Sequence, residues 1–169
     1  MGFFNRKEAE RRGKAVWNPD EILAPVNGRL IPMAEVNDPV FSEEVIGKGA
    51  AIVPGRGRIV APADGTVNLV FRTKHAIGMV TEAGTELMIH IGLDTVRLEG
   101  RLFKEHVAQG SRVKAGDLLM EFKLDQMLEE GYDMTTVVIV CNSAAYPEIS
   151  CRSGGEAVEL EPVIRLRKS

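Results

Sequence analysis

Residues 75–90 of the chain read His75-Ala-Ile-Gly-Met-Val-Thr-Glu-Ala-Gly-Thr-Glu-Leu-Met-Ile-His90, with a histidine at each end. The middle of this stretch, Glu82-Ala83-Gly84-Thr85, is typical of a hairpin turn between two runs of strand-forming residues. An even loop centred on Ala83-Gly84 places His90 opposite Ile77 and puts His75 two residues further along the same face. Such diagonal neighbours lie about 7–8 Å apart, within reach of their side chains. The sequence therefore predicts a site made of two adjacent imidazoles.

The second strand of this hairpin has one apolar face and one mixed face. Alternation along a strand separates two sets, a core set of Leu87, Ile89 and Ile91 and an outer set of Glu86, Met88 and His90. His90 is therefore expected on the outer face rather than in the core. The predicted register adds Ile77 and Met79 to that face, and apolar residues on an outer face indicate a docking patch for a partner.

Short apolar runs separated by Gly, Pro and Asp continue from Glu21 to the C-terminus. This spacing predicts an all-β fold, an antiparallel β-sandwich or barrel of short, jelly-roll-like strands. One or two short helices are expected, at residues 101–109 and 124–130. Two runs, Ile22-Leu-Ala-Pro-Val-Asn-Gly and Ile59-Val-Ala-Pro-Ala-Asp-Gly, share a pattern. They record either two related strand-turn-strand units or a recurrent turn.

The 169 residues suit one domain at 19–169 with a flexible tail at 1–18. Phe3, Phe4 and the basic residues of the tail could form a weak membrane anchor, and at most weak membrane association is expected. The net charge of −3 gives no support to nucleic-acid binding. The two cysteines form no CxxC pair, no apolar run approaches the roughly 18–20 residues of a membrane span, and no signal peptide is evident, so a cytoplasmic protein is expected.

Three chemistries suit two adjacent imidazoles. They could share a metal, but two histidines are too few for catalytic zinc unless Asp94 is the third ligand. They could be a base and its orienting partner, but no Ser or Cys nucleophile stands in a recognisable motif. One could carry a phosphoryl group while the other donates to its oxygens, because neutral imidazole is a nucleophile near pH 7. The third chemistry needs no metal and no further residue.

Several segments, in order from about residue 20 to the end, are similar to one known family. They are Ile22-Leu-Ala-Pro, Val40-Phe-Ser-Glu-Glu-Val-Ile-Gly-Lys-Gly-Ala-Ala-Ile-Val-Pro54, Val60-Ala-Pro-Ala-Asp-Gly-Thr-Val67, Phe71-Arg-Thr-Lys-His75-Ala, Glu86-Leu-Met-Ile-His90-Ile-Gly-Leu-Asp-Thr-Val96 and Gly110-Ser-Arg-Val-Lys-Ala-Gly-Asp117. On these motifs the chain resembles the glucose-family enzyme IIA of the bacterial phosphoenolpyruvate-dependent sugar phosphotransferase system. The resemblance implies an all-β enzyme IIA domain that acts as a histidine phosphocarrier.

The resemblance also implies roles for single residues. His90 would take a phosphoryl group at Nε2 from phospho-HPr and pass it to a cysteine of a sugar-specific enzyme IIB, of glucose type. His75 would stabilise the phosphorylated state, supported by Thr73. The backbone at Gly92 would orient the other nitrogen of His90, and Asp94 would be an acid at the rim. These roles agree with phosphoryl transfer as mostly positioning and charge stabilisation.

Six apolar residues are expected to dock HPr and enzyme IIB in turn: Val40, Phe41, Ile46, Phe71, Met88 and Val96. No cofactor is required and no resident metal is expected, although zinc at His75 and His90, completed by a partner's carboxylate, is implied as an option. Regulatory targets that sense the phosphorylation state are a further option. Lys74 and Arg97 add positive charge near the site, and residues 124–135 diverge from the family.

Two other classes stay open. Residues 107–119 resemble the half-barrel repeat of biotinyl and lipoyl carrier domains, but the modifiable lysine in its Met-Lys-Met setting is missing. The spacing from His90 to Asp94 fits the His-x-x-x-Asp motif of LytM-type zinc peptidases, but their His-x-His motif is missing.

Overall fold

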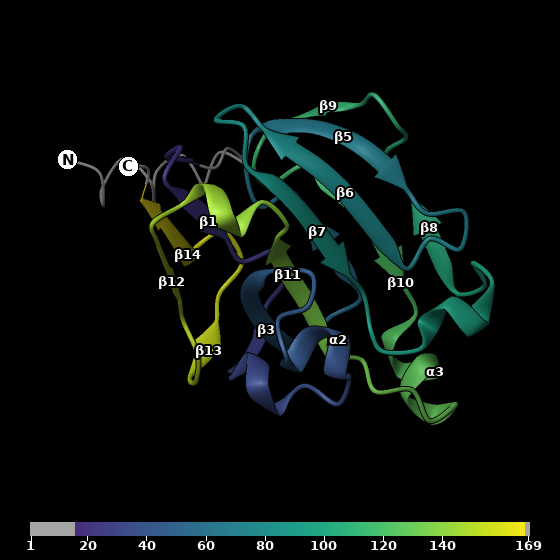
Figure 1. The fold of residues 1–169 in the computed structure, drawn as a ribbon. Coiled ribbons are helices and arrows are strands. Elements are labelled where there is room, and N and C mark those ends of the chain that lie inside the picture. The colour runs from purple at the N-terminus through teal and green to yellow at the C-terminus, as the bar shows by residue number, and fades with distance from the viewer. Residues whose placement is uncertain (1–15, 168–169) are drawn as a thin grey trace.

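The structure is a computed structural model that describes residues 16–167, most of them in short strands and turns (Figure 1). The strands are β1 (Glu21–Leu23), β2 (Gly28–Ile31), β3 (Lys48–Pro54), β4 (Arg58–Val60), β5 (Gly65–Val70), β6 (Ala76–Thr81), β7 (Glu86–His90), β8 (Phe103–Glu105), β9 (Arg112–Val113), β10 (Leu118–Phe122), β11 (Thr136–Val140), β12 (Glu148–Cys151), β13 (Glu156–Ala157) and β14 (Pro162–Arg167). The helices are α2 (Pro39–Ser42) and α3 (Leu124–Glu129), with 3-10 turns η1 (Met33–Glu35), η2 (Thr95–Leu98) and η3 (Ser143–Ala145).

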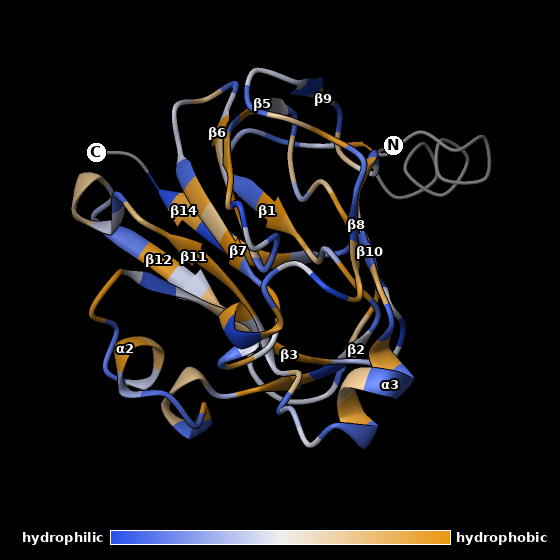
Figure 2. Cartoon of the chain, turned by 90° about the vertical axis from the view of Figure 1, so that its right-hand side faces the viewer, coloured by the Kyte–Doolittle hydropathy of each residue, from blue (hydrophilic) through white to orange (hydrophobic). Residues whose placement is uncertain are grey.

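These strands form three antiparallel sheets around one main core. The large sheet has the order β13-β2-β3-β11-β7-β6-β5-β9, and the two small sheets have the orders β1-β14-β12 and β4-β10-β8. Buried residues from all three sheets join in one cluster, for example Ile22, Ile89, Leu119 and Ile164. The central strand β11 is buried at every residue, and it appears as an apolar band through the middle of the molecule (Figure 2). The prediction of an antiparallel all-β fold with short helices is confirmed.

The strand order of the large sheet reads alike from both ends. We divide the strands into two sets, one of β1–β3 with β11–β14 and the other of β4–β10. Every strand of one set has a counterpart at the matching sheet position in the other. The centre of this correspondence lies between β11 and β7, and each small sheet belongs to one set. The fold therefore consists of two related halves, with the second half inserted into the first.

The two Ala-Pro-x-(Asn/Asp)-Gly runs make matching contacts. The amide of Leu23 donates to the carbonyl of Pro62, and the amide of Val60 donates to that of Pro25, each at 2.9 Å. Each run also binds a residue outside the two runs: Asn27 Oδ1 accepts from the amide of Glu159 at 2.7 Å, and Asp64 Oδ1 accepts from that of Ala115 at 2.8 Å. Reciprocal pairing of this kind favours two related units over a recurrent turn.

The register of the central hairpin is one residue away from the prediction. His90 pairs with Ala76 and Ile89 pairs with Ile77. Thr81 donates to the carbonyl of Thr85, which leaves a loop of three residues that ends on Gly84 at φ 89°. An odd loop replaces the even one, and a one-residue shift exchanges the faces of the partner strand.

The faces of β7 are as predicted, whereas those of β6 are not. Leu87, Ile89 and Ile91 are buried, and Met88 and His90 are half-buried on the outer side. Ile77 and Met79, expected on the outer face, are fully buried in the main core. Their outer-face positions are taken by Ala76, Gly78 and Val80, so the docking patch loses two of its expected members.

The helix predictions were half right. The helix expected at 124–130 is α3. The helix expected at 101–109 is wrong, because β8 pairs with β10 there and positive φ angles at Glu99, Gly100 and Leu102 break a helical path. The short α2 was not predicted. It begins with Pro39 after Asp38, whose side chain accepts from the amide of Val40 at 3.0 Å and caps the helix.

Residues 1–15 lie outside the described part of the chain, and so does the predicted membrane anchor at Phe3 and Phe4. Trp17, which the prediction includes in the tail, packs on the main core and donates its Nε1–H to the carbonyl of Glu21 at 2.8 Å. Between residues 16 and 167, no helix has both the length and the apolar character needed to cross a membrane.

Candidate functional site

The imidazoles of His75 and His90 lie in contact, with ring centroids 5.0 Å apart and planes at 86°. His90 is the last residue of β7, and His75 comes directly before β6. The carbonyl of His75 accepts from the amide of Ile91 at 2.7 Å, so the two histidines are neighbours rather than a direct cross-strand pair. The rings meet where both strands end, next to a tight turn in which Lys74 adopts φ 63°. The predicted pair is present, although it forms by a different route.

Two phenylalanines bracket the pair. The ring of Phe41, on α2, lies 4.8 Å from His90, and that of Phe71, after β5, lies 5.4 Å from His75. Phe41 is only 3% exposed, so it is a wall of the site rather than free docking surface. His75 is itself buried and His90 half-buried. The pair is therefore held in a largely apolar setting.

The Nδ1 atoms of the two imidazoles have different surroundings. Thr73 Oγ1 lies 2.8 Å from Nδ1 of His75, within hydrogen-bonding distance. Nδ1 of His90 is buried and has no hydrogen-bond partner of good geometry among residues 16–167. The Gly92 backbone nevertheless favours the charged form of this ring. Thr73 therefore fixes the orientation of one ring, and Gly92 faces the other.

Burial keeps both imidazoles neutral near pH 7. Desolvation, with a smaller repulsion from His75, lowers the pKa of His90 to about 4. The Gly92 backbone and the carboxylates of Asp38 and Asp94 oppose this shift in the pKa of His90. Burial also lowers the pKa of His75. The uncharged rings keep lone pairs available, while the groups around His90 are ready to stabilise a positive ring.

Gly92 is required by its surroundings. It adopts φ 74°, and a Cβ there would lie 2.6 Å from Cγ2 of Thr95 and 2.9 Å from Sδ of Met134. Thr95 is fully buried and donates its hydroxyl to the carbonyl of Ile91 at 2.5 Å. This bond fixes the turn that follows His90, and only glycine fits at the tightest point.

The acids of the site come from two segments. Asp94 is exposed at φ 58°, directly before η2, as expected for a rim residue. Asp38, the cap of α2, also acts on His90, and sequence reasoning did not single it out. The sequence Asp38-Pro39 is typical of the start of a helix, but it does not indicate a contact with His90. Its closeness to His90 follows from packing between distant segments.

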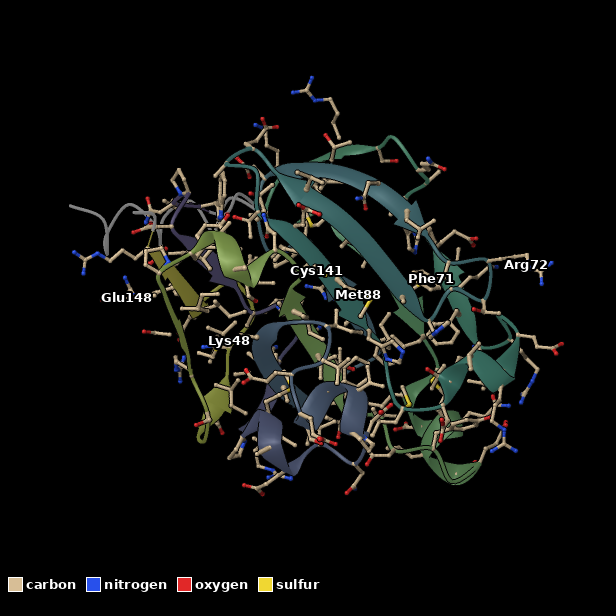
Figure 3. The ribbon with its side chains drawn as sticks, viewed as in Figure 1. Lys48, Phe71, Arg72, Met88, Cys141 and Glu148 are labelled. Atoms are coloured by element: carbon tan, nitrogen blue, oxygen red, sulfur yellow. The ribbon has the colours of Figure 1, made fainter. Side chains whose placement is uncertain are left out.

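The remaining predicted docking residues form a partly exposed apolar rim. Val40 is 41% and Val96 47% exposed, and Ile46, Phe71 and Met88 are half-buried. Val45, 71% exposed, was not predicted and adjoins Ile46. Met88 and Phe71 lie on the face of the large sheet that is turned to the viewer in Figure 3.

The two basic residues noted in the sequence differ in their contacts. Lys74 forms an ion pair with Glu105 at 3.1 Å, which links the turn before His75 to β8. Arg97 is exposed in the last turn of η2 and lines the same hollow as Asp94. Lys74 therefore braces the site, and Arg97 is presented to solvent.

A family model described as the phosphoenolpyruvate-dependent sugar phosphotransferase system, EIIA 1, matches residues 20–146. The chain belongs to this family. The glucose-specific EIIA component of Oceanobacillus iheyensis is 44% identical over 128 residues, which cover 76% of this chain and 78% of that protein. Glucose permease IIA from Mycoplasma capricolum has a TM-score of 0.77 at 33% identity, covering 88% of this chain and 98% of that one.

Longer members of the same system also match this EIIA chain. The glucose-specific EIICBA component of Streptococcus pneumoniae is 44% identical over 136 residues, 80% of this chain and 19% of that protein. The beta-glucoside-specific EIIBCA component of Bacillus subtilis is 43% identical over 145 residues, 86% of this chain and 24% of that protein. The chain thus spans about a fifth to a quarter of these two relatives.

Membership of the family makes this chain a phosphoryl carrier of a sugar phosphotransferase system, as the resemblance implied. The alternatives of a zinc peptidase or a biotinyl carrier receive no support from these matches. Within residues 16–167, no group of three or more His, Cys, Asp or Glu side chains is placed to hold a metal ion. The two imidazoles alone supply only two ligands, so a zinc ion here would need another from a partner.

Proposed function

We propose that His90 takes the phosphoryl group from phospho-HPr and passes it to the cysteine of a sugar-specific enzyme IIB. The observation that carries this proposal is the contact between two neutral imidazoles, buried His75 and half-buried His90, at the end of β7. The similar proteins are glucose-specific and beta-glucoside-specific components, so a IIB of either class is the acceptor to test first, with the glucose type preferred.

Each transfer exchanges one bond for another. The lone pair on Nε2 of His90 attacks phosphorus as the phosphorus–nitrogen bond of the donor breaks, and that bond's electron pair returns to the donor imidazole. The Nδ1 proton of His90 stays in place, so the phosphorylated ring is positively charged. The Gly92 backbone, Asp38 and Asp94 all favour a positive ring at this position. In the second step the thiolate of enzyme IIB attacks phosphorus, and the electron pair returns to Nε2.

His75 is the group that steadies the transferring phosphoryl oxygens. If the Thr73 hydroxyl donates to Nδ1 of His75, the proton of that ring is at Nε2 and can be donated to an oxygen. A neutral donor suits this role, because a second cation would lower the basicity of His90 further. Hydrogen bonds aimed at developing charge are worth about 10²–10³-fold in rate.

The rim formed by Val40, Val45, Ile46, Phe71, Met88 and Val96 is the docking surface of this proposal. One shallow apolar surface around a recessed nucleophile suits two partners that bind in turn and leave again. Such contacts favour small aliphatic and Met side chains, which adapt to different shapes.

The test is transfer of labelled phosphate from phosphoenolpyruvate through enzyme I and HPr. The chain should take up one acid-labile phosphoryl group, and His90→Gln should remove the labelling entirely, because the nucleophile that forms the covalent intermediate is gone. Circular dichroism checks that the variant is folded. Full labelling of the His90→Gln variant would show that another residue is the carrier.

Three further proposals concern context. A cytoplasmic location fits a carrier that meets HPr.

A zinc ion bridging His75, His90 and a carboxylate of a partner would block Nε2 of His90. Zinc should therefore inhibit transfer only when that partner is present. Sensing of sugar supply by regulatory targets would show as capture that depends on the phosphorylation state of His90.

A further inference from the structure

A polar hollow of about 380 Å³ borders the site, lined in part by Asn37, Leu93, Asp94 and Asp133. Asp133 lies shortly before β11. Burial tends to raise the pKa of Asp133, but hydrogen bonds from Thr135 and Asn37 outweigh it and hold the pKa below its usual range. Its side chain is therefore an anion with specific partners rather than a solvated surface acid.

Asp133 contacts both chain segments that flank His90. Its Oδ2 accepts from Nδ2 of Asn37 at 3.3 Å, across 96 positions of sequence. Its main-chain carbonyl accepts from the amide of Leu93 at 2.8 Å. Its Oδ1 accepts from the amide and the hydroxyl of Thr135, at 2.9 and 2.7 Å, which fixes the start of β11.

Each of these contacts of Asp133 involves a residue close to the imidazole of His90. Asn37 directly precedes Asp38, the cap of the helix that sets the ring of Phe41 4.8 Å from His90. Leu93 follows Gly92, and Met134, which is 3% exposed, packs on Gly92. The residue two beyond Thr135 is Val137, the cross-strand partner of His90. One acidic residue thus ties together the cap, the turn and the strand around the nucleophile.

We propose that Asp133 is a positioning residue for His90, acting through its bond to Asn37 to hold α2 against the imidazole. This role rests on the proposed phosphoryl transfer at His90. It concerns the orientation of the nucleophile and its acidic neighbour Asp38, not the binding of the donor. Loosening the bond should therefore slow the transfer step and leave the KM for phospho-HPr nearly unchanged.

The bond can be broken and restored with isosteric changes. Asn37→Asp sets two carboxylates against each other, and adding Asp133→Asn restores a bond with donor and acceptor exchanged. The first variant should accept phosphate about tenfold more slowly at saturating phospho-HPr, since small misplacements of reacting groups slow transfer strongly. The double variant should recover most of the wild-type rate. Asn37 is exposed, Asp133 is half-buried and both changes keep the side-chain shape, so neither variant should unfold the protein.

The matched control is Asp125→Asn added to Asn37→Asp, which removes the same charge at an exposed position of α3. This control should restore nothing. Asn37→Asp at the wild-type rate, a double variant as slow as the single one, or recovery by Asp125→Asn would each overturn the role of Asp133. Absence of labelling in the wild-type chain would instead overturn the proposed function.

Discussion

The two halves of the fold share a scaffold and differ in chemistry. Gly28 begins β2, and Gly65 begins β5, the matching strand of the other half. When the two halves are aligned through the cross-strand partners of these glycines, Lys48 matches His75 and Ile139 matches His90. Ile139 is fully buried, whereas His90 is half-buried and in contact with a second imidazole. The same sheet position therefore holds a nucleophile in one half and a core side chain in the other.

The connection that follows β2 in the first half and β5 in the second explains the difference. In the second half it is a short turn, residues 71–75, that brings His75 to the sheet edge. In the first half it spans residues 32–47 and packs over β3 and β11, where Val36 and Phe41 join Ile139 in a second buried cluster. The longer connection closes the equivalent position in its own half and supplies Phe41 and Asp38 to His90 in the other. One site therefore depends on both halves.

The largest contrast is expected between His75→Gln and its counterpart Lys48→Gln. The first removes the donor that faces the phosphoryl oxygens, so transfer from phosphorylated chain to enzyme IIB should slow by about 10²-fold, while acceptance from HPr persists. Lys48 is exposed and has no role in the proposed transfer, so its substitution should leave both steps unchanged. Rapid-quench measurement of each half-reaction tests the pair. Normal transfer by His75→Gln would show that His75 plays no part in the reaction.

A second contrast compares Gly92→Ala with Cys141→Ala, which follow β7 and β11 at matching positions. Alanine at φ 74° is strained and would press on Thr95 and Met134. Phosphate acceptance should fall by about tenfold or more, with about 1–3 kcal/mol lost in the free energy of unfolding. Cys141 is exposed and should tolerate alanine. Urea unfolding and labelling rates measure both, and equal effects in the two variants would contradict the special role of Gly92.

The sequence was sufficient to predict which side chains react in the second half, but not how they are arranged. The Glu82-Ala83-Gly84-Thr85 turn suits loops of two or three residues, and only the observed Gly84 conformation selects the odd loop that buries Ile77 and Met79. The alternation along β7 was sufficient to place His90, because it is local. Asp38 and Asp133 could not be found in the same way, since their effects on the site arise from contacts across long stretches of sequence.

A third test uses pH, because the matching position Ile139 cannot titrate. The pKa of His90 is lowered to about 4, so between about pH 4 and 6.5 the unfolded chain binds a proton there that the folded chain does not. Stability should therefore be complete above pH 6.5 and fall as the pH drops toward 4, by about 2 kcal/mol after allowance for partial exposure. His90→Gln should lose this component of the pH dependence. Chemical denaturation at about pH 7.5 and 4.5 measures the free energy of unfolding of the two proteins. The same change in that free energy between the two pH values in both proteins would show that His90 is not desolvated.

The smallest effect is expected from Ile139→Val, which tests whether the first half contributes only packing. Removing one buried methylene should lower the free energy of unfolding by about 0.5–1.5 kcal/mol. Ile139 shares its cluster with Phe41 and with Val137, the cross-strand partner of His90, so any loosening could reach His90 through either residue. If the cluster is a support for α2 and nothing more, the labelling rate should change by less than about twofold, since the change removes a single methylene. A larger loss of rate at unchanged stability would mean that the closed position of the first half still acts on the nucleophile of the second.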